Sequence, residues 1–262
     1  MSEVGSHNEP SASRAPEGMA GLAKGLAIIE LFGRSASQLS VASAAEGIGV
    51  ARATARRCLL TLVELGYVEH DGRYFHPTPR MLRLGGTYLD TASLPALARP
   101  HLVAARDVLG ESVSLAVREH EWSTFVARAE ADRIVSTGVR VGARLPVHCS
   151  ATGRVLLAAL PDGEAADLLR AETAQRRTPH TVVDPDELLG MLPRIREERL
   201  ALSDEELELG MRAMAVPVVD CGGRTAAAMS VSVFSARVSA ERMRREFAPV
   251  LQREADLLGR KL

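Results

Sequence analysis

LSVASAAEGIGVARATARRCLLTLVELGYVEHDGRY, residues 39–74, is the stretch that decides the fold of the N-terminal part of this 262-residue chain. A short helix is expected to begin after Ser40, whose hydroxyl can accept hydrogen bonds from the free backbone N–H groups of the first turn, and to end near Gly47 and Gly49. The next helix carries apolar residues at the period of an amphipathic helix. These residues are Ala55, Leu59, Leu62 and Val63.

A β-hairpin is predicted directly after this second helix. Asp71-Gly72 separates Tyr67-Val68-Glu69 from Arg73-Tyr74-Phe75, and glycine tolerates the positive φ of a tight two-residue turn. Helix, turn, helix and hairpin in this order predict a winged helix-turn-helix. The alternative is an all-helical domain whose arginines form a solvated face, but it does not account for the hairpin.

The polar side of the second helix is basic, because no acidic residue occurs between Gly47 and Leu62. A helix that enters the major groove presents guanidinium and hydroxyl groups to phosphates and base edges. The predicted DNA-binding residues are Lys24, Arg52, Thr54, Arg56, Arg57 and Arg73. Ala51 stands where Ser or Thr would cap this helix better, so its start is expected to fray.

The overall composition limits the other classes. The formal net charge is −1, so affinity for nucleic acid must come from a local patch. The three cysteines form no C-x-x-C pair, which argues against a zinc ribbon or a disulfide framework. Residues 1–18 are polar and are expected to be a disordered tail without a signal peptide, and no stretch approaches the roughly twenty apolar residues of a membrane span. We therefore expect a cytoplasmic protein that makes no contact with a membrane.

Helices flank the winged segment on both sides. Residues 22–34 are predicted to form a first helix whose inward stripe is Leu22, Leu26, Ile29, Leu31 and Phe32. Thr78-Pro79 predicts the start of a linker helix, and a further helix is expected to be broken around Pro95 and Pro100.

From residue 112 the periodicity changes to that of an α+β domain with an antiparallel sheet flanked by helices. Strands are predicted at residues 112–118, 123–128, 134–139, 214–219 and 225–233, the last two joined by a glycine turn. Helices are predicted at residues 151–160, after Asp184 and from Ser239 to about 258. The expected organisation is a tail at 1–18, a winged helix-turn-helix at 19–78, a linker helix at 79–93 and an effector domain at 94–262.

Several longer segments carry a specific resemblance. GLAKGLAIIELF, ARATARRCLLTLVELGYV, GARLPVHCSATGRVLLAALP and DEELELGMRAMAVPVVDCGGRTAAAMSVSVFS are similar to segments of the IclR family of bacterial transcriptional regulators, and the similarity covers residues 22–262. RMLRLGGTYLD and RRTPHTVVDPDEL resemble the branch of Pca and Pob regulators of aromatic-acid catabolism. This resemblance implies a winged helix, a connecting helix, a GAF-like effector domain and assembly into dimers or tetramers.

The resemblance also implies where an effector binds. The pocket lies between the loop before the helix at Ala151 and the central sheet, and its lining residues would be Leu145, Ala151, Thr152, Ser203, Ala213, Ser230 and Ser232. The start of a helix favours a carboxylate, and two serines two residues apart on one strand face the same side. The alternative is that Ser150 only caps the helix and that both serines are ordinary strand residues.

Two positions depart from other family members. Some members carry an acidic residue where this chain has Ser203 and a cysteine where it has Ala213. Their absence argues against glyoxylate or pyruvate and favours an aromatic acid, such as protocatechuate or 4-hydroxybenzoate, or a dicarboxylic intermediate of the β-ketoadipate pathway. A short keto acid or a sugar-derived acid is the alternative. Arg140 and Arg144 are either partners for a second carboxylate or solvated side chains.

An enzyme is the remote alternative. A hydrolase would use Cys149 with His148, or Ser150 in a triad, but adjacent side chains in an extended segment point apart and no acidic partner is evident. A metal site at His148 and Cys149 lacks further ligands, so no catalytic residue, metal or cofactor is expected. Met191, Met211, Met214 and Met229 are expected to fill the core. A purely architectural DNA protein would not need a sensor domain.

The sequence thus predicts a ligand-responsive transcriptional regulator. Two recognition helices of a homodimer, or of a dimer of dimers, would bind successive major grooves of double-stranded operator DNA. A small organic acid would shift the dimer between two arrangements through the linker helix. The branch resemblance favours activation, and an activator would also contact RNA polymerase.

Overall fold

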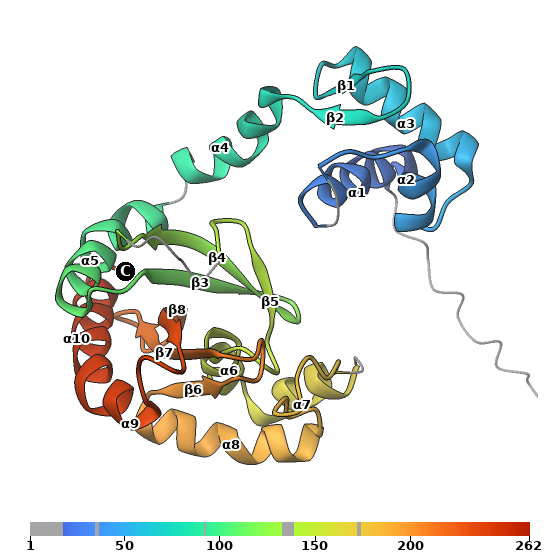
Figure 1. Ribbon diagram of the computed structural model, residues 1–262. Helices are drawn as coiled ribbons and strands as arrows, with labels where there is room; N and C mark the ends of the chain where they lie inside the picture. Colours follow the sequence, from blue (N-terminus) through green and yellow to red (C-terminus); the bar gives the residue numbers. More distant parts are fainter. Residues whose placement is uncertain (1–17, 35–36, 92, 133–138, 172–173) are drawn as a thin grey trace, which may run out of the picture. The chain divides into compact units, whose positions relative to one another are not determined.

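The computed structural model describes residues 18–34, 37–91, 93–132, 139–171 and 174–262 (Figure 1). The chain divides into two units, one up to Asp90 and one from Thr91 onwards. The predicted tail, apart from its last residue, and nearly all of the strand predicted at 134–139 lie outside the described residues.

The N-terminal unit is the predicted winged helix-turn-helix. It contains helices α1 (Ala20–Arg34), α2 (Val41–Gly47) and α3 (Arg52–Glu64) and strands β1 (Val68–His70) and β2 (Phe75–Pro77). The Ser40 hydroxyl caps α2 by accepting a hydrogen bond from the Ser43 backbone N–H at 3.0 Å, as predicted. Ala51 precedes α3 and supplies no capping side chain. The core of this unit is formed by Ile28, Ala44, Ala55, Leu59, Leu62, Val68 and Phe75.

Two predictions for this unit are wrong in detail. Leu22 and Leu26 are 60% and 47% exposed, so the inward stripe of α1 is centred on the fully buried Ile28 instead. The strands of the wing are shorter than expected, and β2 begins only at Phe75. The reason is the Asp71 carboxylate, which accepts hydrogen bonds from the backbone N–H groups of Arg73 and Tyr74 at 2.8 and 2.7 Å and thereby folds these residues into the turn.

The helices between the winged segment and the sheet begin as expected but continue further. Thr78 caps a 3₁₀ turn, η1 (Pro79–Met81), which leads into α4 (Leu82–Thr91). Helix α5 (Ser93–Leu109) has Pro95 in its first turn and runs through Pro100 without a break, so the predicted interruption there is wrong. A proline removes one backbone hydrogen bond, and the burial of Ala98, Leu102 and Ala105 outweighs that loss.

The C-terminal unit is built on a six-stranded antiparallel sheet with strand order β5-β4-β3-β8-β7-β6. The strands predicted at 112–118, 123–128, 214–219 and 225–233 are all present, each within a few residues of the expected ends. The short edge strands β5 and β6 were not predicted. The strand bounds are β3 (Val113–Glu119), β4 (Trp122–Ala129), β5 (Arg144–Pro146), β6 (Ala201–Asp204), β7 (Met211–Val219) and β8 (Thr225–Phe234).

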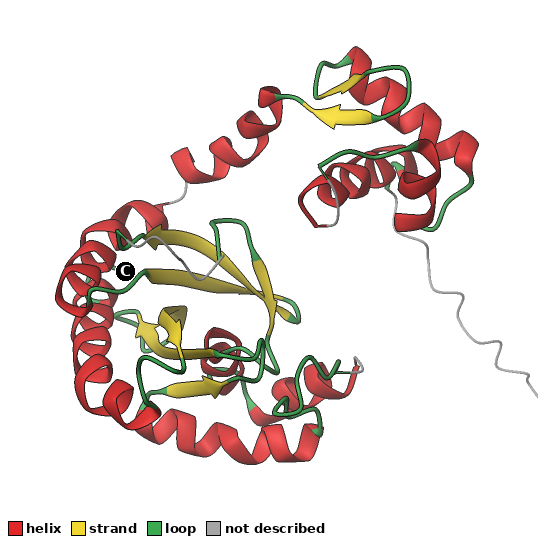
Figure 2. Cartoon of the chain, in the orientation of Figure 1, coloured by secondary structure: helices red, strands yellow, loops and turns green. Residues whose placement is uncertain are grey.

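Helices cover both faces of this sheet, which confirms the α+β class (Figure 2). Helices α5 and α10 (Ala248–Gly259) pack on one face, and α6 (Ala151–Ala158), with α8 (Pro185–Glu198) behind it, packs on the other. Ser150, Asp184 and Ser239 cap their helices as predicted. The last predicted helix consists of α9 (Ala240–Arg242), a π-helical turn (Met243–Phe247) and α10, and α7 (Asp162–Ala171) was not predicted. No helix in the described ranges is long and apolar enough to cross a membrane.

Alternation along the strands separates two kinds of side chain. In β8, Met229, Val231 and Val233 belong to the large core formed with α5 and α10. Ser230 and Ser232, which alternate with them, line a cavity on the α6 side of the sheet. One face of the sheet is therefore filled by large apolar residues, and the other carries small residues that leave space.

Candidate functional site

A cavity of about 330 Å³ lies between the sheet and the start of α6. All seven residues expected to bind an effector line it, namely Leu145, Ala151, Thr152, Ser203, Ala213, Ser230 and Ser232. The remaining lining residues are Ser114, Phe125, Arg128, Val139, Ala143, Ser150, Leu207, Glu208, Met211 and Phe234. The structure thus brings together residues that are up to 120 positions apart in the sequence, from Ser114 to Phe234.

Rows of small residues across neighbouring strands form the floor of this cavity. Ser114 pairs with Ser230, which also pairs with Ala215 on the far side of β8. In the next row Ala213 lies between Ser232 and Ser203. Small side chains on adjacent strands leave a depression that α6 covers without filling.

Arg128 is the cationic side chain among the described residues that line the cavity, and the sequence did not predict it. Its side chain is only 5% exposed, and Nη1 donates a hydrogen bond to the Ser114 hydroxyl at 3.0 Å. Its Nε lies 3.3 Å from a Glu130 carboxylate oxygen at the surface. Its Nη2 is buried and has no hydrogen-bond partner among the described residues. A buried guanidinium with an unused N–H pair favours an anionic ligand.

The first turn of α6 is the second polar element of the cavity. Ser150 Oγ accepts a hydrogen bond from the Gly153 N–H at 3.1 Å and donates one to the Pro146 carbonyl at 2.7 Å, so this hydroxyl caps the helix. Thr152 Oγ1 accepts from Ser123 Oγ at 2.7 Å. The backbone N–H groups of Ala151 and Thr152 have no acceptor within the helix, because they belong to its first turn. They give this wall a partial positive charge.

Arg140 and Arg144, the alternative partners for a second carboxylate, do not line the cavity. The Arg144 guanidinium lies 5.1 Å from the centroid of the Trp122 ring and 3.6 Å from the Glu119 carboxylate. Arg140 is exposed. Among the described residues that line the cavity, the positive charge therefore comes from Arg128.

His148 and Cys149 do not form a nucleophile and base pair. Cys149 is fully buried, and burial raises the pKa of its thiol to about 11. Burial lowers the pKa of His148, and its Nε2–H donates a hydrogen bond to the Gln175 carbonyl at 3.2 Å. Within the described ranges, no three His, Cys, Asp or Glu side chains are grouped in a way that could hold a metal ion. This geometry offers a protonated thiol beside a neutral imidazole, which is unsuited to nucleophilic catalysis.

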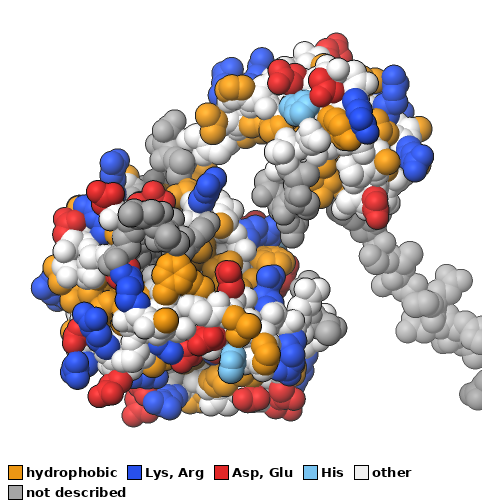
Figure 3. Space-filling model, in the orientation of Figure 1, with side chains coloured by type: hydrophobic (Ala, Val, Ile, Leu, Met, Phe, Trp, Pro, Cys, Tyr) orange, Lys and Arg blue, Asp and Glu red, His pale blue; other side chains and the backbone are white. Residues whose placement is uncertain are grey.

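The predicted DNA-binding side chains fall into two groups. Arg52, Arg56 and Arg73 are exposed, and the Arg73 guanidinium lies 5.0 Å from the centroid of the Tyr74 ring in the wing. Lys24 and Thr54, both half-buried, border an apolar groove between α1 and α3 together with the exposed Arg57. The groove has a volume of about 700 Å³, and its apolar residues include Leu22, Leu26, Ile29, Leu65 and Leu84. Lys and Arg side chains project among hydrophobic ones on the face drawn in Figure 3.

A winged helix with a basic α3, joined to an α+β unit that holds a cavity with a buried arginine in its wall, defines a DNA-binding regulator that responds to a small molecule. The chain belongs to the IclR family of bacterial transcriptional regulators. Residues 21–72 match the IclR helix-turn-helix domain, and residues 86–259 match the family described as bacterial transcriptional regulator IclR C-terminal. The family descriptions and the named relatives are those of transcriptional regulators.

Individual relatives are similar along most of the chain. The Pca regulon regulatory protein of Pseudomonas putida is 36% identical over 237 residues, which are 90% of this chain and 81% of the relative. The p-hydroxybenzoate hydroxylase transcriptional activator of Acinetobacter baylyi is 36% identical over 251 residues, with 94% and 92% covered. The crystal structure of an IclR homologue from Microbacterium hydrocarbonoxydans in complex with 4-hydroxybenzoate superimposes with a TM-score of 0.73 at 26% identity, with 92% and 98% covered.

Proposed function

We propose that this protein regulates a catabolic operon in response to a hydroxybenzoate-type aromatic acid that binds in the cavity beside α6. The observation that carries the proposal is the buried Arg128 guanidinium, whose Nη2 lies in the cavity wall without a partner among the described residues. The names of the relatives support the ligand class, since they include a regulator of p-hydroxybenzoate hydroxylase and a homologue in complex with 4-hydroxybenzoate.

The cavity suits an aromatic acid in size and in the distribution of polarity. A volume of about 330 Å³ lies within the usual range for small-molecule sites. Phe125, Leu145 and Phe234 supply apolar surface for a ring. Arg128 supplies a charge-assisted partner for the carboxylate, and the floor serines supply partners for a ring hydroxyl. The first turn of α6 would favour a second carboxylate, so a dicarboxylic pathway intermediate is the competing ligand.

The DNA-binding role is assigned to residues 19–78, with residues 79–93 as the linker and 94–262 as the effector domain. Two subunits would pair through the winged-helix and linker segments, whose exposed leucines, among them Leu22, Leu26 and Leu84, are unfavourable in water. The two α3 helices would then enter successive major grooves of a partly palindromic operator. The regulator would act in the cytoplasm as a homodimer or a dimer of dimers. If it activates transcription, it would also contact RNA polymerase.

The effector can change DNA affinity only through a difference in its affinity for two arrangements of the assembled regulator. Helix α4 directly follows the wing through the Thr78-capped turn, so it is the segment through which such a difference would pass. This chain has no charged side chain at Ser203 or Ala213. A short keto acid is small and makes few contacts, so the loss of polar contacts at these positions argues against it as the effector.

Calorimetric titration of the full chain with 4-hydroxybenzoate, protocatechuate, β-ketoadipate, glyoxylate and pyruvate tests this proposal. Arg128→Met is expected to weaken binding of the preferred acid by roughly 10- to 150-fold, the equivalent of a charged hydrogen bond worth about 1.5–3 kcal/mol. Arg144→Met is the matched control, because Arg144 lies outside the cavity, and it should change affinity less than twofold. Preference for a keto acid, or equal affinity of the Arg128→Met variant, would contradict the proposal.

A further inference from the structure

We propose that the buried ion pair between Arg154 and Glu206 is a clamp that sets the distance between two walls of the effector cavity, so that both residues position the effector site without touching the ligand. Neither residue lines the cavity. This inference rests on the proposed function of the cavity. It adds a requirement for binding that the lining residues do not reveal.

The clamp is buried and its hydrogen bonds are directed. Arg154 and Glu206 are 4% and 8% exposed, and the two terminal nitrogens of Arg154 donate to the two carboxylate oxygens of Glu206 at 2.6 and 2.5 Å. The remaining Arg154 nitrogen, Nε, donates to the His148 carbonyl at 3.0 Å. The Val182 N–H donates to Glu206 Oε2 at 3.3 Å. The planar fork of arginine thus fixes both orientation and distance.

One end of the clamp holds the wall formed by the start of α6. The His148 carbonyl, which Arg154 binds, lies two residues before Ser150 and three before Ala151, and both of these line the cavity. The next carbonyl, that of Cys149, accepts a hydrogen bond from the Ser203 hydroxyl at 2.9 Å. Ser203 itself belongs to the cavity floor. The segment before α6 is therefore fixed by two consecutive carbonyls.

The other end of the clamp holds the wall formed by residues 205–210, which we call the cavity turn. Leu207 and Glu208 follow Glu206 directly and line the cavity. The turn begins at Glu205, with a φ of 57°, and ends at Gly210, with a φ of 79°. The Glu205 carboxylate closes it by accepting a hydrogen bond from the Gly210 N–H at 2.9 Å. A shift of the Glu206 carboxylate would therefore displace the turn as a unit.

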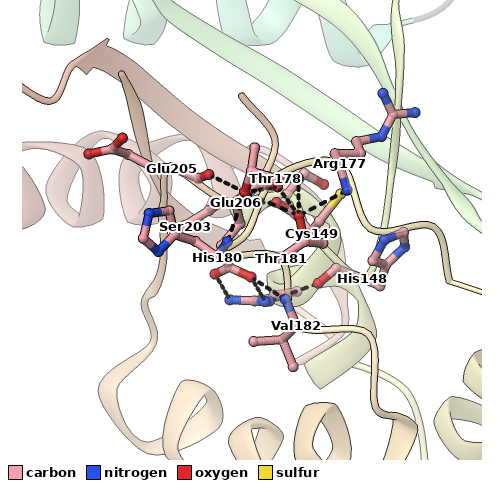
Figure 4. Close-up of polar contacts among 12 residues, drawn as sticks. His148, Cys149, Arg177, Thr178, His180, Thr181, Val182, Ser203, Glu205 and Glu206 are labelled. Carbon is pink, nitrogen blue, oxygen red and sulfur yellow. Dashed lines mark hydrogen bonds and ion pairs between the residues drawn. The ribbon is translucent and has the colours of Figure 1, made fainter. Parts of the chain in front are cut away.

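Two threonines support the cavity turn from the outside (Figure 4). Thr178 Oγ1 donates to the Glu205 carbonyl at 2.7 Å, and Thr181 Oγ1 donates to the Glu206 carbonyl at 2.6 Å. Both hydroxyls are buried. They tie the segment that precedes α8 to the same turn that the clamp holds, so the cavity wall is held by the clamp and by this segment together.

A buried ion pair is a poor device for stability alone, because desolvation of both charges cancels most of their attraction. Replacing both partners with apolar residues of similar length is commonly tolerated, whereas removing one partner leaves an unpaired buried charge. A double apolar replacement consequently separates the two roles. It should preserve the fold while it releases the His148 carbonyl and the cavity turn from each other.

The test compares the wild-type chain with Arg154→Met/Glu206→Met in titrations with 4-hydroxybenzoate. The double variant is expected to bind at least tenfold more weakly, with faster amide hydrogen exchange in residues 205–210 and unchanged operator affinity in the absence of effector. Arg170→Met/Asp186→Met is the matched control, since that pair is 2.7 Å long but lies exposed on α7 and α8. The control should bind effector like the wild type.

A second variant, Thr178→Val/Thr181→Val, keeps the test decisive if the first double variant does not fold. It removes two hydroxyls without unpairing a charge and should weaken effector binding at least threefold. The clamp is overturned if the wild type binds the aromatic acid and either the folded clamp variant or the threonine variant binds it with the same affinity. The proposed function stays intact in that case. Failure of the wild type to bind any of the aromatic acids overturns the proposed function, and the clamp with it.

Discussion

His148 shows how burial decides the chemistry of a single side chain. Its Nε2–H is committed to the Gln175 carbonyl, and burial lowers its pKa below the ordinary value of 6.5. The unfolded chain therefore binds a proton at this residue more readily than the folded chain does, and His148 stabilises the fold above pH 6.5 and loses this contribution as the pH falls below it. Between pH 7.5 and 5.5, the melting temperature of the wild type should fall further than that of His148→Gln. His120→Asn replaces an exposed histidine and is the control, so its melting temperature should fall as that of the wild type does. Equal falls for wild type and His148→Gln would contradict the assignment.

The residues of the cavity could be predicted only in part. The family resemblance implied seven lining residues, serine spacing on β8 and the helix start at Ser150 supported that choice, and the structure places all seven in one cavity. Arg128 was not predicted, because a β-bulge in β4 makes Phe125 and Arg128 face the same side of the sheet. In a regular strand, two residues at this odd spacing would face opposite sides. No period-2 pattern can reveal such a position, because the bulge depends on pairing with a strand elsewhere in the chain.

Helix α6 requires a glycine at position 153, because its first turn packs directly against the backbone that precedes it. A Cβ on Gly153 would lie 2.3 Å from the Val147 Cα and 2.6 Å from its carbonyl oxygen, and backbone cannot move aside locally. Gly153→Ala is expected to displace the start of α6, lower the unfolding midpoint by several degrees, at roughly 2–4 °C per kcal/mol, and weaken effector binding. Gly190→Ala in α8, where a Cβ would meet nothing within 4 Å, is the matched control and should stabilise by up to about 1 kcal/mol. A normal melting midpoint for Gly153→Ala would contradict this packing argument.

Elements with a local signal were the ones that the sequence predicted. Ser40, Ser150, Asp184 and Ser239 all cap helices where their side chains suggested it, since capping requires only neighbouring residues. The edge strands β5 and β6 contain three and four residues, too few to show alternation, and they exist because longer strands offer them partners. Tertiary burial likewise keeps α5 helical through Pro100.

At the scale of the whole molecule, the division into two units follows from the change of periodicity near residue 112 and from the linker helix signal at Thr78-Pro79. The boundary in the structure, between Asp90 and Thr91, falls close to the end of the expected linker. The exposure of Leu22 and Leu26 was not predictable from the chain alone, because an amphipathic period does not say whether an apolar stripe meets its own domain or a second copy.

The charge of the whole molecule sets the final prediction. With a formal net charge of −1, the chain has no general attraction for DNA, so operator affinity must depend on the few arginines of α3. Arg56→Ala/Arg57→Ala should weaken operator binding, by about 1–3 kcal/mol for each arginine that contacts a base, and lower the slope of log affinity against log salt by roughly 0.9 for each phosphate that the variant no longer neutralises.

Arg194→Ala/Arg245→Ala removes two exposed arginines of the C-terminal unit that form surface ion pairs, and should leave both quantities unchanged. Fluorescence anisotropy with a promoter fragment between about 50 and 300 mM salt, conditions under which phosphate binding changes affinity by orders of magnitude, measures both quantities. A common slope for wild type and the α3 variant would show that these arginines do not face the phosphates, and DNA binding would then have to be assigned to another surface of the protein.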